Sequence, residues 1–78
     1  MQENNDQNED FLMALAERIK SLREARSLTQ EDAYNDTGIH FGRIETGRWD
    51  PKLSTIHRIA TYFELSIPEF FGEGFGVH

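Results

Sequence analysis

The side chains that can do chemistry in this chain are three histidines, eight basic residues and a few amides and hydroxyls. His40, His57 and His78 lie in three different segments, and none has a histidine or carboxylate partner at the spacing of a metal site. No nucleophile motif is present, and the absence of cysteine excludes thiolate ligands and disulfides. The sequence therefore predicts no enzyme, no metal site, no cofactor and no small-molecule substrate.

The charged residues are distributed unevenly along the chain. The formal charge is −6, which at first argues against a nucleic-acid partner, but residues 1–10 hold four acids and no basic group. Residues 11–71 hold all eight basic residues against nine acids, a balance near neutral. We therefore expect a disordered acidic tail over residues 1–10, a folded domain over 11–71 and a C-terminal tail over 72–78.

The elements that must position these groups are predicted to be five short helices. Apolar residues repeat at helical spacing from Phe11 to Leu22, which predicts a first helix from about Asp10 to Ala25 or Arg26. Thr29, followed by acids, has the character of an N-cap for the second helix. Gly47 is suited to end the third helix in a left-handed conformation.

The last two helices have N-terminal signals of their own. Ser54 is predicted to cap a fourth helix, in which apolar residues recur from Ile56 to Phe63. Ser66 and Glu69 form a capping box that opens a brief fifth helix. No alternating strand pattern and no apolar run long enough to span a membrane appears. We predict a compact all-α domain in a reducing cytoplasm, without a membrane partner.

The order of short sequence words between Leu15 and Phe71 resembles the lambda-repressor-like, or Cro/XRE, helix-turn-helix family. The matching words are Ile19, Leu22 and Arg23, then Leu28-Thr29-Gln30-Glu31, Arg43-Ile44-Glu45-Thr46-Gly47-Arg48, Asp50-Pro51-Lys52-Leu53-Ser54-Thr55-Ile56, Ile59-Ala60, and Leu65-Ser66-Ile67-Pro68-Glu69-Phe70-Phe71. The resemblance implies a five-helix domain whose third helix reads duplex DNA in the major groove.

The helix-turn-helix unit is shorter than the family pattern. Eleven residues, 32–42, separate the words Thr29-Gln30-Glu31 and Arg43-Ile44-Glu45, where the family usually has about fourteen. Three residues are nearly one helical turn, so the facing of the helices is kept. In the preferred alignment the second helix and the turn are shortened, and Thr37 becomes the N-cap of the recognition helix. In the alternative, the turn stays intact around Gly38 and the recognition helix itself is truncated.

The resemblance implies a set of DNA contacts. His40 and Arg43 can donate to guanine, Ile39 can meet a thymine methyl, and Gln30 is the usual phosphate or base contact of the family. Arg48 and Lys52 flank the loop after the recognition helix and can hold the DNA backbone. The candidate DNA-binding residues are Gln30, Thr37, Gly38, Ile39, His40, Arg43, Arg48 and Lys52.

The family resemblance predicts a sequence-specific transcriptional regulator that binds a palindromic operator as a homodimer. The expected dimer surface is the fifth helix with the tail after it, where Phe70, Phe71, Phe75 and Val77 are too apolar to be all buried in one small core. The alternative is a protein-interaction module of the same fold that has lost DNA binding. The acidic tail either aids solubility or competes with DNA for the basic face.

Overall fold

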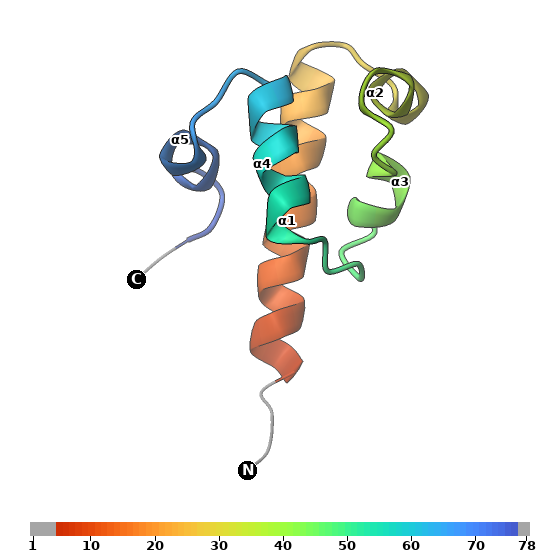
Figure 1. The fold of residues 1–78 in the computed structure, drawn as a ribbon. Helices are drawn as coiled ribbons and strands as arrows, with labels where there is room; N and C mark the ends of the chain where they lie inside the picture. Colours follow the sequence, from red (N-terminus) through yellow and green to blue (C-terminus); the bar gives the residue numbers. More distant parts are fainter. Residues whose placement is uncertain (1–4, 77–78) are drawn as a thin grey trace.

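The computed structural model describes residues 5–76, and the backbone forms five helices joined by short loops (Figure 1). They are α1 (Asn5–Ala25), α2 (Gln30–Thr37), α3 (Phe41–Ile44), α4 (Leu53–Tyr62) and α5 (Ile67–Phe71). No strand occurs among these residues, so the all-α prediction is confirmed.

The first helix is longer than its apolar stripe predicts. It begins at Asn5 instead of about Asp10, so the expected boundary is wrong and residues 5–10 of the predicted tail are helical. Asn, Asp, Gln and Glu carry no apolar stripe, but they do not break a helix that the following turns already hold in place. Residues 1–4 lie outside the described residues. The C-terminal end at Ala25 is as predicted, and the N-terminal turns extend beyond the other helices (Figure 1).

Of the N-caps predicted for the second, fourth and fifth helices, two are confirmed and one is wrong. The Thr29 hydroxyl accepts from the backbone N–H of Asp32, whose carboxylate accepts from the N–H of Thr29 in return. Ser66 and Glu69 form the same reciprocal pair at the start of α5. These hydrogen bonds lower the pKa of both carboxyl groups. Ser54, in contrast, lies inside α4, which begins one residue earlier with Lys52 at the N-cap.

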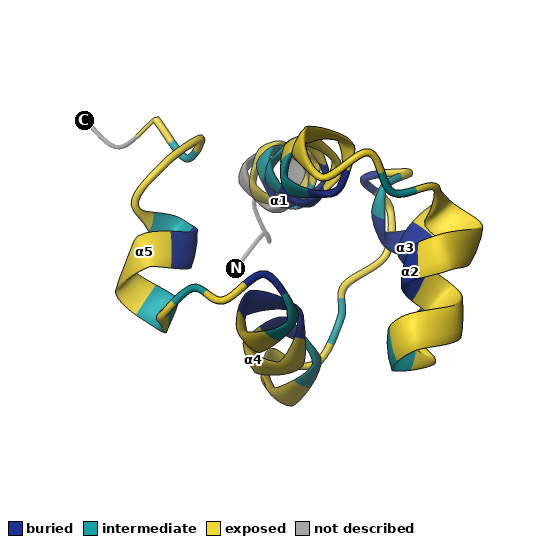
Figure 2. Ribbon diagram, turned by 90° about the horizontal axis from the view of Figure 1, so that it is seen from above, coloured by how far each residue is buried: buried dark blue, intermediate teal, exposed yellow. Residues whose placement is uncertain are grey.

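The core is formed where all five helices meet. Figure 2 shows the buried residues of α4 and α5 turned toward the space between the helices. Phe41, Phe63 and Phe70 are the largest side chains that are fully buried. The buried cluster consists of Leu15, Ile19, Ala33, Ile39, Phe41, Ile44, Ile56, Ile59, Ala60, Phe63 and Phe70. The short α3 therefore has two anchors in this core, at its first and last residues.

The C-terminal segment packs back on α1. Arg18 donates from Nε to the carbonyl of Phe70 at 2.8 Å and from Nη2 to the carbonyl of Glu69 at 3.0 Å. The rings of Phe75 and Phe11 lie 5.6 Å apart between centroids. The expectation that Phe70, Phe71 and Phe75 are not all buried in the core is confirmed. Phe70 is fully buried and the other two are half-buried. Val77 lies outside the described residues.

Candidate functional site

The shortening of the helix-turn-helix unit falls in the recognition helix. Gly38 has φ +75° and ends α2 in the left-handed conformation, so the turn is kept and α3 is a helix of four residues. The preferred alignment is therefore wrong and the alternative is right. Thr37 does not cap α3, because it is the last residue of α2. Its hydroxyl donates to the carbonyl of Ala33 and accepts from the N–H of Ile39.

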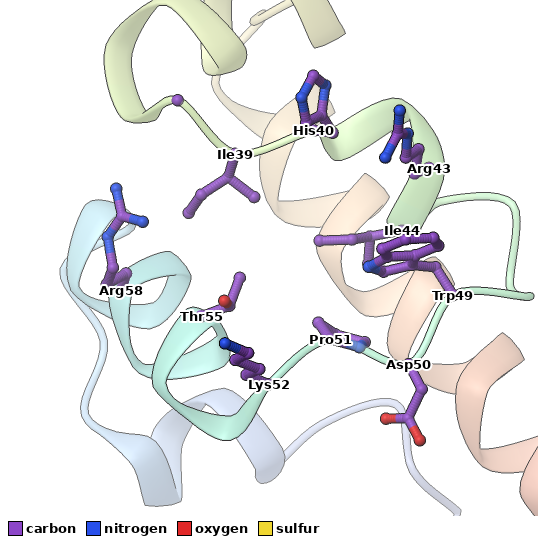
Figure 3. Close-up of a pocket in the computed structure, with 11 residues that line it drawn as sticks. Ile39, His40, Arg43, Ile44, Trp49, Asp50, Pro51, Lys52, Thr55 and Arg58 are labelled. Atoms are coloured by element: carbon purple, nitrogen blue, oxygen red, sulfur yellow. The ribbon is translucent and has the colours of Figure 1, made fainter.

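A pocket of about 400 Å³ lies between α3, the following loop and the first turns of α4 (Figure 3). In Figure 3, Arg43 and Trp49 lie on one side of it, while Ile39 and Arg58 lie on the opposite side. The lining residues are Gly38, Ile39, His40, Arg43, Ile44, Trp49, Asp50, Pro51, Lys52, Thr55 and Arg58. Apolar side chains and three cations thus share the lining of the pocket with one acid, Asp50.

The basic residues divide into a structural set and an unpaired set. Arg18, Arg23 and Arg26 each form an ion pair and each also donates to backbone carbonyls of other segments. Four of the other five basic residues come from positions 43–58, and among the described residues these four form no ion pair. Three of the four line the pocket, namely Arg43, Lys52 and Arg58. The cations without a carboxylate partner are thus concentrated beside α3.

The predicted site residues are only partly brought together. The pocket gathers Gly38, His40, Arg43 and Lys52, and all four are exposed. Ile39 also lines it but is only 6% exposed and belongs to the core, so the expectation that it meets a thymine methyl is wrong. Its position directly after the glycine turn directs its side chain inward, between α2 and α4.

Gln30 and Arg48 do not line the pocket. Gln30 is exposed and donates from Nε2 to Oε1 of Glu45 at 3.0 Å, so its amide position is fixed. Arg48 is exposed and lines a second hollow together with Glu9 of α1. An acidic residue of the N-terminal segment therefore lies beside a predicted phosphate contact.

Glu45 is held by a buried arginine. Nε and Nη2 of Arg23 donate to the two carboxylate oxygens of Glu45 at 2.8 and 2.9 Å, and Nη1 donates to the carbonyl of Leu28 at 2.6 Å. The Glu45 carboxylate raises the pKa of the Arg23 guanidinium through hydrogen bonding and charge. This ion pair ties the end of α3 to α1.

Sequence reasoning missed two residues of this surface. Arg58 donates from Nη2 to the carbonyl of Thr37 at 2.5 Å and so joins α4 to the end of α2. Its position on α4, off the apolar stripe, was the available signal. Trp49 is 48% exposed, and the Arg43 guanidinium lies over its ring, with Cζ 5.4 Å from the ring centroid.

Neither a metal site nor a membrane helix is found within residues 5–76. No group of three histidine or acidic side chains there is arranged to hold a metal ion. No helix of this part of the chain is both long enough and apolar enough to cross a bilayer.

Comparison with known proteins identifies the domain. The family model described as a helix-turn-helix domain matches residues 14–70, which covers all of the chain from the middle of α1 to α5. No curated protein and no solved structure matches the chain. The match includes the pocket and every unpaired cation beside α3.

Proposed function

Because this chain belongs to the helix-turn-helix domain family, we propose that it binds duplex DNA sequence-specifically and regulates transcription in the cytoplasm. The observation that supports this proposal best is the concentration of unpaired cations beside α3. A protein that neutralises phosphates needs cations that are not already paired with its own carboxylates. The charge of −6 belongs to the whole chain: four of its 14 acids lie in residues 1–10, whereas the pocket is lined by three basic residues and one acid, Asp50.

The exposed groups divide into base readers and phosphate contacts. His40 and Arg43 lie at the start of α3 and within it, where donors can reach the guanine acceptors N7 and O6 in the major groove. Lys52, Arg48 and Arg58 surround them and suit phosphates, as does the free part of the Gln30 amide. With only four residues in α3, base reading depends on these few side chains.

We expect Arg43→Ala and Gln30→Ala each to weaken binding to a selected duplex by about 1–3 kcal/mol. Lys52→Ala is the matched control for charge. It should weaken binding to all sequences alike. It should also reduce the magnitude of the slope of log K against log[salt], the salt slope, by about one. Binding is measured by fluorescence anisotropy on a duplex selected from a random pool, with circular dichroism to establish that each variant is folded. Wild-type affinity in both Arg43→Ala and Gln30→Ala would contradict the assignment of these residues.

In this proposal the protein acts as a homodimer on a palindromic operator, since one short recognition helix reads too few bases. The proposed surface is the aromatic group of Phe11, Phe71 and Phe75, where α1 meets the segment after α5. Phe11 is 50% exposed, so a second copy can cover it. To reach two half-sites one turn of DNA apart, the recognition helices of such a dimer must lie about 34 Å apart.

Sedimentation at micromolar concentration is expected to give about twice the chain mass of 9.1 kDa. Phe11→Asp should shift the protein to monomer without disturbing the core, because Phe11 is half exposed in the single chain. Met13→Asp on the same helix is the control, as Met13 is also exposed but lies outside the aromatic group. A wild-type protein that is monomeric both free and on DNA would contradict the dimer.

The rival function is a protein-interaction module with the same fold that no longer binds DNA. The observation that favours it is the short α3, which offers one arginine where a full recognition helix offers several contacts. A column of immobilised mixed-sequence duplex DNA separates the two functions. A DNA-binding protein is retained at low salt and elutes as the salt concentration rises. Passage through the column without retention would favour the interaction module.

A further inference from the structure

Trp49 is the one tryptophan of the chain, and its apolar ring is only partly removed from solvent. It is 48% exposed in the loop after α3, between Arg48 and Asp50. Its ring lies under the Arg43 guanidinium, with Cζ 5.4 Å from the ring centroid, and both side chains line the same wall of the pocket (Figure 3). The contact is of the cation–π type, which favours arginine on tryptophan.

This contact matters for base reading because the truncated α3 offers few side chains that can reach a base. Of its four residues, Phe41 and Ile44 are buried and Gly42 has no side chain, so Arg43 is the one reading group that the helix presents. An arginine on an exposed helical turn samples many rotamers and must lose that freedom when it forms two hydrogen bonds to a guanine. A ring that already restricts the side chain reduces this loss.

From this geometry we infer that Trp49 is a positioning residue that holds Arg43 for base reading, and so determines specificity at one base pair. The inference depends on the proposed DNA binding. Arg43 makes the contact with the base, while Trp49 acts through Arg43. The ring also leaves the nearby phosphate contacts unaffected, because Lys52 and Arg58 reach the pocket from α4 and its N-cap.

The first test uses the free protein. Trp49 fluorescence reports this ring alone, so Arg43→Ala should change its emission and make it more accessible to a neutral quencher such as acrylamide. Lys52→Ala, which removes a cation from the same pocket without removing the stacked group, should leave the quenching unchanged. Equal quenching in wild type and Arg43→Ala would overturn the inference, whatever the protein binds.

The second test uses selection from random duplexes. Trp49→Ala should lower the preference for guanine at one position by about three- to tenfold and leave the salt slope unchanged. Trp49→Phe should restore most of the preference, since it keeps a ring. In an Arg43→Ala background, Trp49→Ala should have no further effect, because the two residues act as a unit.

The outcomes separate the inference from the proposed function. A Trp49→Ala variant that binds duplex DNA with unchanged base preference would overturn the positioning role and leave the proposed function standing. A uniform loss across all sequences with a lower salt slope would also overturn it, since Trp49 would then support phosphate contacts. A wild-type protein that binds no duplex would overturn the proposed function and the inference with it.

Discussion

Arg23→Ala is expected to lower the free energy of unfolding by about 3 kcal/mol, and Glu45→Ala by a similar amount. The two side chains are only 10% and 4% exposed and are joined by two charge-assisted hydrogen bonds. Removing one partner leaves the other charge desolvated and unpaired, and the lost Arg23 also leaves the carbonyl of Leu28 without its donor. The measurement is urea unfolding followed by circular dichroism.

Glu73→Ala is the matched control for this pair. Glu73 pairs with Arg18 at 3.4 Å, but its side chain is 81% exposed, so its loss should cost less than about 1 kcal/mol. The comparison separates the effect of burial from the effect of charge, since both variants remove one carboxylate from an arginine. An equal loss in Glu45→Ala and Glu73→Ala would contradict the buried-pair account. The same Glu45→Ala variant also frees the Gln30 amide, which then has no fixed orientation.

The parts of the fold that depend on local signals were predictable from the sequence. The caps at Thr29 and Ser66 each depend on a hydroxyl and an acid three residues later, so the signal and the structure lie within one turn. The start of α1 was not predictable in this way, because the apolar stripe begins only at Phe11 while the helix continues to Asn5. Periodicity detects the packed part of a helix, not its solvated extension.

The location of the shortening was decided by tertiary packing. Both alignments kept the facing of the helices, so local signals did not separate them. In the structure Gly38 adopts the left-handed turn, Ile39 is buried in the core, and α3 runs only from Phe41 to Ile44. The contacts of Trp49 with Arg43 and of Arg58 with Thr37 join different segments, so the sequence did not predict them, although the place of Arg58 off the apolar stripe marked it as a surface residue.

Phe41 holds this single turn in place, and Phe41→Ala is expected to lower the free energy of unfolding by about 3–5 kcal/mol. The ring is fully buried, with Phe63 and Tyr62 each 6.3 Å away between centroids. Its removal leaves a cavity that the core, already closed by α1 and α4, fills only in part. For a domain of this size such a loss is a large share of the total stability.

The same substitution should separate folding from DNA binding. At low temperature, where part of the Phe41→Ala population stays folded, affinity for a selected duplex should fall by more than the unfolded fraction explains. The reason is that Ile44 alone then anchors the turn that carries Arg43. Phe41→Leu, which keeps most of the volume, should cost less than about 2 kcal/mol and retain binding. Phe11→Ala, at a half-exposed ring, should cost less than about 1 kcal/mol. If Phe41→Ala and Phe11→Ala unfold at the same urea concentration, the prediction is contradicted. Contacts other than those of Phe41 would then hold α3 in place and position Arg43.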